Sequence, residues 1–546
     1  MKRFRLFILS FFSGLLLSLP WYPWFSGIIL LIAWVPALFA EEYFYSNKDQ
    51  YKSHVCLGFT YITFLTWNLL ATWWLYKASL PGAIIVVIIN SFLMSLVFFL
   101  FHLTKRNLGR RFGNFSLLVY WIGWEYLYLN AEISWPWLNL GNGFAKDISL
   151  IQWFELTGTL GGTLWILAVN FIIFGVLRHF ILYKSFATQM PRLIFLLVLI
   201  ILPLVLSFNL MDRQVSHANT IEVGIVQPNI DPYHEKFSGM DQQEQLDVIL
   251  NLAEKIVTPG TNYIVGPETA LFDSISENDL HSHRAIRRIK HFVDQHPQVH
   301  FIIGMDSYKT YQSEERPTPT AGKTDKPGVF IDHFNAAIQI DTSGRYQVYH
   351  KSKLVAGVEK MPYPRIFGFL NHWILDLGGI KGSRGSQPHR EVFHAPGLQA
   401  QVAPVICYES IYGEHVSDYI QKGANLIFVI TNDGWWGQTI GYRQHLNYAR
   451  LRAIETRRSI VRAANTGISC FIDPNGRIHK PVQWGKETAI HGSIRTNEKL
   501  TFYAQYGDYI GRVAAFMAVF AILYLIAQIL VSRSRHADLE KLRKPR

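Results

Sequence analysis

One cysteine in the sequence stands where a nucleophile would be useful. Cys407 ends an apolar run and is followed directly by Tyr408 and Glu409, so we expect it where a buried strand gives way to a helix. Such a turn exposes one side chain at the edge of a sheet and directs backbone N–H groups toward the group that this side chain attacks. A buried, inert cysteine is the alternative for the segment taken alone. Cys56 and Cys470 have no comparable neighbours, and we expect both to be structural.

A lysine and two carboxylates could supply the proton transfer that such a thiol needs. Glu268 stands in a Gly-Pro-Glu-Thr segment after a short apolar run, and Lys351 precedes Glu359 by eight residues. A thiol of pKa about 8.5 attacks as the thiolate, so a base must take its proton and a cation must stabilise the remaining charge. Each segment also has a simpler interpretation, because Glu268 could cap a helix or face solvent and the Lys351–Glu359 pair could be solvated.

The elements around these residues predict an α/β domain that brings them together. A polar and aromatic cluster that includes Trp435 and Trp436 follows the last apolar run, and α/β folds gather their sites at the carboxyl ends of strands. Short apolar runs indicate strands at 221–226, 263–265, 300–303, 336–340, 400–406 and 424–430. Helical patterns lie at 241–257, 279–294, 410–422 and 442–457. That mixture is typical of helices covering sheets, and the polar segment 312–328 indicates a solvated loop.

The composition shows that a large part of the chain is not suited to water. Hydrophobic residues make up 49% of it and charged residues 17%, against about 25% charged in soluble domains. Only residues 212–509 have the composition of a soluble domain. Eight stretches approach the roughly 20 residues that a membrane-crossing helix needs, at 5–19, 24–40, 56–76, 82–103, 114–131, 158–181, 193–211 and 510–531. The first could instead be a signal peptide, although no small-residue cleavage site follows it.

Lys and Arg residues are concentrated in alternate short loops, which predicts an orientation. The short loops of the other side contain only Lys77 and Lys146. Loops rich in Lys and Arg remain in the cytoplasm, so we expect both termini, including the basic tail 532–546, on that side. The block 212–509 would then lie outside the cytoplasm. The formal net charge of +12 is therefore largely a topology signal, and we do not expect nucleic acid as a partner.

Taken together and in order, the motifs resemble the nitrilase superfamily. Its pattern is a Glu in Pro-Glu-Thr, a Lys in Tyr-x-Lys with a second Glu eight residues on, and a Cys in Ile-Cys-Tyr-Glu, and this chain matches it at Glu268, Lys351, Glu359 and Cys407. Seven spans before the domain and one after it are similar to the apolipoprotein N-acyltransferase family. Three other segments resemble that family, namely Trp135-Pro136-Trp137, Gln227-Pro228-Asn229 and the stretch 444–469. The chain departs from the family pattern at Gly266 and at Ala356-Gly357-Val358.

The resemblance implies a fold and a role for each motif. The fold would be a membrane domain at 1–211 with seven helices, an extracytoplasmic αββα sandwich at 212–509 and an eighth transmembrane helix at 510–531. Glu268 would be the general base and Cys407 the nucleophile. Lys351, held by Glu359, would stabilise the thiolate and the oxyanion together with the backbone N–H of Tyr408.

Further residues acquire supporting or substrate-contacting roles by the same resemblance. Glu409 would support the site as Glu359 does. Phe237 would lie on a lid arm and contact substrate, and Trp435 and Trp436 would contact substrate or lie at the membrane interface. Three aromatic residues of the outer loops would suit the same interface or belong to the core, namely Trp135, Trp137 and Trp153.

The implied reaction moves a fatty acyl chain through a thioester on Cys407. The donor would be a phospholipid, with phosphatidylethanolamine favoured. The acceptor would be the α-amino group of the diacylglyceryl-cysteine that begins a lipoprotein. The enzyme would be a monomer in the bacterial inner membrane, with its site facing the outer leaflet. We expect no cofactor, because neither metal-ligand spacing nor a glycine-rich phosphate loop is found.

Three alternatives remain open from the sequence. A membrane-anchored amidase that releases ammonia would use the same Glu268, Lys351 and Cys407. A non-catalytic scaffold would bind lipoproteins without acting on them. A transporter would need more ionisable residues inside its spans than Glu125 and Glu155.

Overall fold

The computed structural model describes residues 2–211, 219–236, 239–364, 383–395 and 397–543, and the chain forms two compact units. The first contains residues 1–73, 81–209 and 508–546, and the second contains 74–80 and 210–507. The expected domain boundaries at 211 and 509 lie close to those of the units. The difference is the segment 74–80, which overlaps the end of the third expected span and belongs to the second unit.

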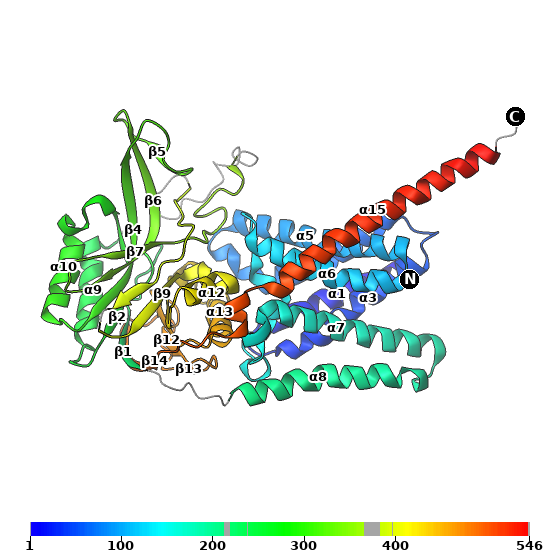
Figure 1. The fold of residues 1–546 in the computed structure, drawn as a ribbon, viewed down its shortest axis with the longest axis horizontal. Helices are drawn as coiled ribbons and strands as arrows, with labels where there is room; N and C mark the ends of the chain where they lie inside the picture. The colour runs from blue at the N-terminus through cyan, green and yellow to red at the C-terminus, as the bar shows by residue number, and fades with distance from the viewer. Residues whose placement is uncertain (1, 212–218, 237–238, 365–382, 396, 544–546) are drawn as a thin grey trace. The chain divides into compact units, whose positions relative to one another are not determined.

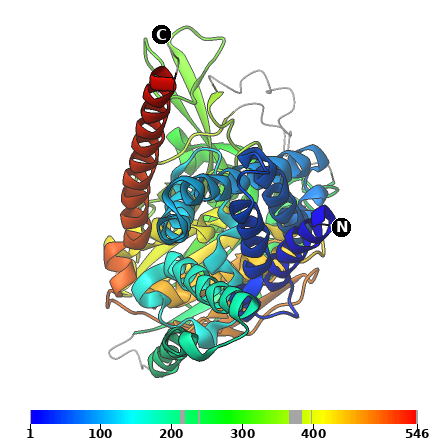
Figure 2. The same cartoon turned by 90° about the vertical axis from the view of Figure 1, so that its right-hand side faces the viewer.

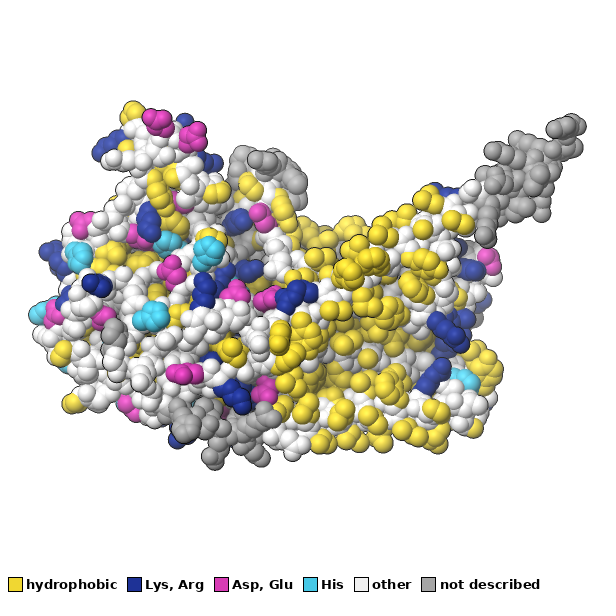
Figure 3. Space-filling model, viewed as in Figure 1, with side chains coloured by type: hydrophobic (Ala, Val, Ile, Leu, Met, Phe, Trp, Pro, Cys, Tyr) yellow, Lys and Arg dark blue, Asp and Glu magenta, His cyan; other side chains and the backbone are white. Residues whose placement is uncertain are grey.

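The first unit is a bundle of apolar helices. They are α1 (Lys2–Ser18), α2 (Leu30–Ala33), α3 (Val35–Ser46), α4 (Ser53–Thr72), α5 (Leu80–Leu108), α6 (Arg110–Asn130), α7 (Phe154–Tyr183), α8 (Met190–Met211) and α15 (Tyr509–Arg543). Most run roughly parallel in Figure 1 and are seen nearly end-on in Figure 2. Hydrophobic side chains cover the face of this unit in Figure 3, and Leu197 and Phe516 are 58% and 66% exposed. Apolar surface on this scale requires a lipid environment.

Seven helical segments among the described residues are long and apolar enough to cross a membrane. They are Lys2–Trp21, Gly27–Ser46, Ser53–Lys77, Leu80–Leu108, Phe154–Tyr183, Ala187–Met211 and Tyr509–Ser534. These segments correspond to seven of the eight expected spans. The remaining span, 114–131, is helix α6, whose Asn, Glu, Tyr and Trp side chains make it less apolar than the others.

A buried carboxylate in α6 holds the loop that follows this helix. Glu125 accepts hydrogen bonds from Trp121 Nε1 (3.0 Å), the backbone N–H of Leu140 (2.8 Å) and Thr163 Oγ1 (2.7 Å). The next residue, Gly141, packs directly on α7, because a Cβ there would lie 2.0 Å from a backbone oxygen of that helix. Glu125 therefore has a structural role in linking α6, the loop and α7.

Replacing Glu125 with leucine should destabilise the first unit. The change leaves the donors of Trp121, Leu140 and Thr163 without their acceptor inside the bundle, and each such buried group costs about 1–3 kcal/mol. Glu125→Gln is the matched control, because its amide oxygen can still accept from Trp121 and Leu140. Thermal unfolding of the purified protein in detergent should show a large drop in Tm for Glu125→Leu and a small one for Glu125→Gln. Equal Tm values for both variants would contradict the anchoring role.

Of the two alternatives left open for Trp137 and Trp153, interface or core, the structure supports the core. Trp137 is fully buried and Trp153 is 6% exposed, so both indoles belong to the core of the first unit. Trp137 stacks on Trp135 with ring centroids 5.2 Å apart, and Trp153 contacts Trp165 edge to face. The sequence pattern could not separate the two outcomes, because a wide apolar ring suits either environment.

A second group of ionisable residues, which the sequence analysis did not anticipate, links α3, α5 and α7. Lys105 pairs with Glu41 and lies 2.9 Å from Glu42. Glu41 also lies 2.8 Å from His102 Nδ1, and Glu42 lies 2.8 Å from Arg178 Nε. These charges are paired with one another across helices, as in a structural network. They give no support to the transporter alternative.

The second unit contains two β-sheets. The strands are β1 (Thr220–Gln227), β2 (Tyr263–Val265), β3 (Leu271–Ser276), β4 (His300–Gln312), β5 (Gly322–Lys323), β6 (Val329–Ile340), β7 (Gln347–His350), β8 (Phe393–Ala395), β9 (Ala400–Ile406), β10 (Leu426–Thr431), β11 (Ile460–Ala464), β12 (Cys470–Ile472), β13 (Ile478–His479) and β14 (Thr488–Arg495). One sheet has the order β14-β1-β2-β4-β6-β5, with β3 beside β4 and β7 beside β6. The other has the order β13-β12-β11-β10-β9-β8.

Helices cover the outer faces of the two sheets (Figure 1). They are α9 (Gln242–Glu254), α10 (Arg284–Gln295), α12 (Gly413–Gln421) and α13 (Gly441–Thr456), and α14 (Phe502–Tyr506) follows near the end of the unit. The first sheet packs on α9 and α10 through a cluster that includes Phe301 and Ile289. Its other face shares a core with the second sheet, α12 and α13 that includes Val223, Val405 and Ala453. The layers confirm the expected αββα sandwich.

Two strands are much longer than the apolar runs that predicted them. β4 and β6 pair in antiparallel register from Phe301 opposite Ile340 to Gln312 opposite Val329. The expected loop 312–328 joins their far ends and contains the short strand β5. It is attached to the sheet by the hydroxyls of two threonines, Thr318 and Thr320, which donate to Asp332 Oδ2 (2.6 and 2.8 Å).

Candidate active site

The proposed nucleophile lies at a sharp turn after a central strand. Cys407 directly follows β9, which is flanked by β8 and β10, and begins a 3₁₀ helix that runs from Cys407 to Ile411. Its φ is +51°, a left-handed conformation that costs a non-glycine residue free energy and is concentrated at functional sites. The side chain is buried but retains 9% exposure. The turn therefore holds a thiol at the end of the strand in a conformation that its surroundings must maintain.

Lys351 joins the two carboxylates predicted from the sequence. It follows β7, and its Nζ lies 3.0 Å from Glu268 Oε1 and 2.9 Å from Glu359 Oε1. Lys351 is 2% exposed. Burial opposes its charge, but the two carboxylates and Cys407 raise the pKa of Lys351 well above its ordinary value. The structure thus places a permanent cation between two acids.

Glu268 is fixed from two directions. It lies in the loop after β2, where its Oε1 accepts a hydrogen bond from Asn335 Nδ2 (2.9 Å) and its Oε2 accepts one from the backbone N–H of Asn432 (3.2 Å). Gly304 on β4 makes room for the loop, because a Cβ there would lie 2.6 Å from Glu268 Cα. On the next residue, Thr269 Oγ1 accepts from the buried Lys236 Nζ (2.6 Å).

Asn335 is a site residue that the sequence analysis missed. It lies on β6, one residue before the predicted strand 336–340, and its Nδ2 also donates to Glu359 Oε1 (2.9 Å). One amide thus contacts the same carboxylate oxygens that Lys351 contacts. An asparagine inside a strand has no local signal of this kind, because its partners come from other parts of the chain.

The electrostatic surroundings of Cys407 are mixed. Burial raises the pKa of the Cys407 thiol well above its ordinary value, and Glu268 raises it further, whereas Lys351 and the hydroxyl of Thr431 lower it. The free enzyme therefore holds a thiol rather than a stable thiolate. A thiol with a raised pKa needs a base to become nucleophilic, and Glu268 and Lys351 both lie close enough to Cys407 to interact with it electrostatically.

Glu359 closes the turn in which the chain departs from the family pattern. Its Oε2 accepts from the backbone N–H of Val355 (2.9 Å), and its own N–H donates to the Val355 carbonyl (2.9 Å). Gly357 has φ +77°, which suits this tight turn. Burial raises the pKa of Glu359, but Lys351 and the hydrogen bonds lower it below its usual value. The altered turn therefore still holds a carboxylate against Lys351.

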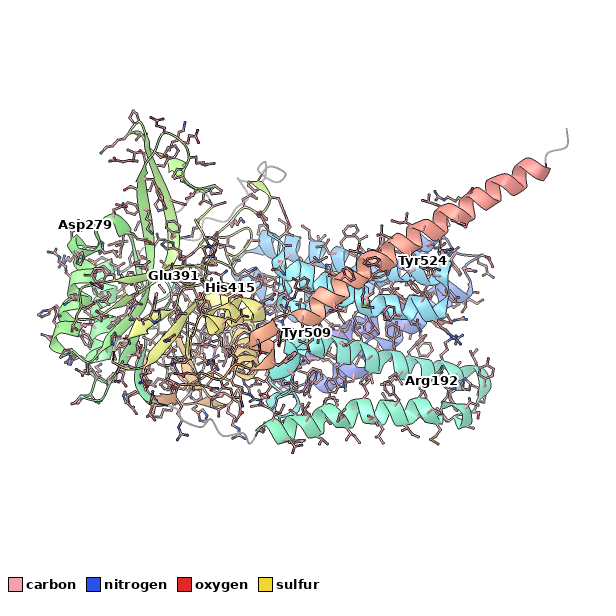
Figure 4. The ribbon with its side chains drawn as sticks, viewed as in Figure 1. Arg192, Asp279, Glu391, His415, Tyr509 and Tyr524 are labelled. Carbon is pink, nitrogen blue, oxygen red and sulfur yellow. The ribbon has the colours of Figure 1, made fainter. Side chains whose placement is uncertain are left out.

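Glu409 connects the lysine segment to the nucleophile strand. It is fully buried, and its Oε1 accepts from Tyr349 Oη (2.8 Å) and the backbone N–H of Ser352 (2.6 Å), while its Oε2 accepts from the N–H of Ile406 (2.9 Å). Although burial raises its pKa, His415 (Figure 4) and the backbone hydrogen bonds lower it to about 2. Glu409 thus joins the segment that follows Lys351 to the end of the strand that precedes Cys407.

Three predicted substrate-contacting residues have different outcomes. Phe237 lies outside the described residues. Trp435 accepts a hydrogen bond from Tyr233 Oη at its carbonyl (2.9 Å) and contacts the Tyr233 ring. Trp436 lies between Trp74 of the segment 74–80 and His445, with ring centroids 4.9 and 5.5 Å away. Both indoles are only partly exposed, and their contact with substrate stays a prediction.

The two further cysteines are fully buried and lie in different units. Cys56 and Cys470 are 1% and 0% exposed, and burial raises the pKa of Cys470 to about 12. Within the described part of the chain, no group of three or more His, Cys, Asp or Glu side chains could hold a metal ion.

Comparisons with known proteins cover both units of the chain. Residues 222–498 match the carbon-nitrogen hydrolase family, and residues 13–172 match the apolipoprotein N-acyltransferase N-terminal domain. An apolipoprotein N-acyltransferase from Chlorobaculum tepidum is 29% identical over 482 residues, which cover 86% of this chain and 87% of that protein. One from Rickettsia typhi is 27% identical over 469 residues, 84% of each. The solved structure of an amidase from Nesterenkonia sp. aligns with 52% of this chain and 94% of its own, with a TM-score of 0.35 and 16% identity.

Proposed function

The chain belongs to the carbon-nitrogen hydrolase family, and on that premise we propose that it is a membrane acyltransferase acting on lipoproteins. It transfers a fatty acyl chain from a phospholipid to the α-amino group of the diacylglyceryl-cysteine that begins a lipoprotein. The observation that carries this proposal is the presence, in one chain, of a match to the apolipoprotein N-acyltransferase N-terminal domain and a match to a hydrolase family. The alignments with two apolipoprotein N-acyltransferases also cover most of the length of both chains.

The first half-reaction loads the enzyme. Cys407 Sγ attacks the ester carbonyl of the phospholipid while Glu268 takes the thiol proton. Negative charge develops on the carbonyl oxygen, where Lys351 and the backbone N–H of Tyr408 stabilise it, each good donor contributing about 3 kcal/mol. The ester C–O bond then breaks, and Glu268 returns its proton to the leaving lysophospholipid oxygen. The products are a thioester on Cys407 and a lysophospholipid.

The second half-reaction transfers the chain to the acceptor. The neutral α-amine attacks the thioester carbonyl, and Glu268 accepts a proton from the nitrogen as the second oxyanion forms. The C–S bond breaks, the proton passes to the departing Cys407 sulfur, and an amide is released. Because the two substrates never meet, ping-pong kinetics follow.

The membrane unit explains why a hydrolase-type domain would act on lipids. Both proposed substrates are anchored in a bilayer, so a site attached to membrane helices meets them without extracting them. Phosphatidylethanolamine as the donor and a monomeric enzyme are part of the proposal. The distribution of Lys and Arg supports cytoplasmic termini and a site on the outer face of the inner membrane, because few basic residues lie in the alternate short loops.

A two-step labelling experiment tests the function. Purified enzyme is incubated with phosphatidylethanolamine labelled in one acyl chain, and then with a peptide that begins with diacylglyceryl-cysteine. We expect label first on Cys407, as a bond that hydroxylamine cleaves, and then on the peptide amine. Ammonia release from small amides with no label on Cys407 or the peptide would instead favour the amidase alternative and refute the acyltransferase.

A further inference from the structure

A buried hydrogen-bond network lies behind the nucleophile, on the side of its carbonyl group. The carbonyl oxygen of Cys407 accepts from Ser410 Oγ (2.8 Å) and lies 3.1 Å from His445 Nε2. Ser410 Oγ and His445 Nε2 are themselves 3.0 Å apart. Ser410 is fully buried and His445 is 1% exposed. One side chain of the same 3₁₀ helix and one from α13 therefore converge on a single backbone oxygen.

Both nitrogens of the His445 ring have hydrogen-bonding partners. A carbonyl oxygen only accepts hydrogen bonds, so a hydrogen bond between these two atoms requires the tautomer with a hydrogen on Nε2. On the other side of the ring, Nδ1 lies 2.9 Å from Asp433 Oδ1 and 3.1 Å from Arg462 Nη2. Arg462 Nη2 also donates to Asp433 Oδ2 (2.8 Å). Burial raises the pKa of Asp433, but Arg462 and His445 lower it overall, so a carboxylate orients the ring.

The far side of the ring is packed as well. Trp436 meets the His445 ring edge to face at 5.5 Å. Trp74, in the segment 74–80 of the same unit, contacts Trp436 and donates from Nε1 to Gln444 Oε1 (3.1 Å). A Cβ on Gly441, at the start of α13, would lie 2.6 Å from the Trp74 indole. The first turns of the helix that carries His445 are therefore held on two sides.

A fixed carbonyl at Cys407 has a direct consequence for the oxyanion. The peptide unit that joins Cys407 to Tyr408 is planar and trans, so its C=O and its N–H point in opposite directions. Donors that hold the Cys407 oxygen on one side thereby aim the Tyr408 N–H at the other. The left-handed φ of Cys407 would relax without such restraint, because that conformation persists only where neighbouring groups enforce it.

We propose that His445 is a positioning residue for the oxyanion site, oriented by Asp433 and assisted by Ser410. It touches no reacting atom, and it acts by fixing the Cys407–Tyr408 peptide so that the N–H of Tyr408 faces the carbonyl oxygen under attack. This inference rests on the proposed function, because it assigns His445 to the formation of the Cys407 thioester.

Two substitutions of His445 separate its hydrogen bond to the Cys407 oxygen from the packing of its ring on Trp436. His445→Gln places an amide N–H at about the reach of Nε2, whereas His445→Asn stops at about the reach of Nδ1 and cannot donate to the Cys407 oxygen. Both remove the imidazole from Trp436 equally. We expect single-turnover acylation of Cys407 by labelled phosphatidylethanolamine to fall about 100-fold in His445→Asn and about tenfold or less in His445→Gln, since one oxyanion donor is worth about 10²–10³ in rate.

The rate at which iodoacetamide alkylates Cys407 distinguishes the two roles of His445. If His445 only supported the fold of the turn, its substitution would lower this rate as well as the rate of acylation. Displacement at a saturated carbon forms no oxyanion, so its rate depends on the thiol and Glu268 but not on the Tyr408 N–H. We expect the alkylation rates of both His445 variants to stay within about threefold of wild type while acylation diverges. Parallel loss of alkylation and acylation would show that His445 only supports the turn, and would overturn the proposal.

Ser410→Ala keeps the proposal falsifiable if the His445 variants fold poorly. It removes one donor to the Cys407 oxygen and leaves His445 in place, so acylation should fall about tenfold with alkylation unchanged. Acylation at the wild-type rate in both Ser410→Ala and His445→Asn would overturn the inference while leaving the acyltransferase intact. Absence of acylation in wild type would refute the proposed function, and this inference with it.

Discussion

Cys407→Ser should lose both half-reactions, with acylation reduced by about 10⁴-fold or more, the scale on which removal of a catalytic nucleophile acts. The substitution exchanges one atom at a position that is 9% exposed, so the turn after β9 should be retained. A hydroxyl is far harder to deprotonate than a thiol, and a carboxylate such as Glu268 cannot activate it. Single-turnover labelling with phosphatidylethanolamine measures the loss directly.

Cys470→Ser is the matched control for this result. Cys470 is fully buried in the same unit. It lies in β12 opposite Arg462 of β11, and neither Lys351 nor Glu268 is among the charged groups that shift its pKa. Its substitution should cost some stability and leave labelling per folded molecule unchanged. Equal labelling in Cys407→Ser and wild type would refute the thioester. In cells, a lipoprotein-binding scaffold would keep its function in Cys407→Ser, whereas the proposed enzyme would lose it.

The layered fold was predictable because its central strands are buried on both faces. The runs at 263–265, 400–406 and 424–430 are continuous and apolar, as strands between two layers must be, and the structure has β2, β9 and β10 at those places. The long pair β4 and β6 was only half predicted. Its outer parts mix polar and apolar residues without a continuous apolar run, and continuous cross-strand pairing extends the strands there.

The candidate site also contains residues that the sequence could predict and residues that it could not. Glu268 and Cys407 follow predicted strands, so their position at strand ends could be expected. The strand before Lys351, β7, was not predicted, and the place of Lys351 at the site was expected only from the family resemblance. Asn335 and His445 could not be assigned, because an amide within a strand and a histidine on a helix acquire their roles only from partners far away in sequence. Composition alone is a weak predictor for the span 114–131. Its helix, α6, packs against α7 and α15, and these contacts hold it in the bundle although it is less apolar than the other spans.

Lys351→Met should abolish acylation and also destabilise the second unit. The substitution preserves the volume of the side chain but removes the charge that lies 3.0 Å from Glu268 and 2.9 Å from Glu359. Breaking a buried ion pair by removing one partner costs about 3–5 kcal/mol, and loss of an oxyanion donor costs about 10²–10³ in rate. Lys353→Met is the matched control, because Lys353 lies two residues away and packs over the Tyr412 ring instead.

The pH dependence of that destabilisation distinguishes lost charge from lost packing. In wild type, the lowered pKa of Glu359 means that its carboxylate stabilises the fold above its ordinary pKa, and this stability is lost as the pH falls through the lowered value. Without Lys351, burial dominates and raises the pKa of Glu359, so the folded variant binds a proton more readily than the unfolded chain does. Lowering the pH from 7 toward about 5 should therefore narrow the difference in Tm between Lys351→Met and wild type. A difference that stays constant over this range would mean that the methionine disturbs packing alone, and that Lys351 does not balance the two carboxylates.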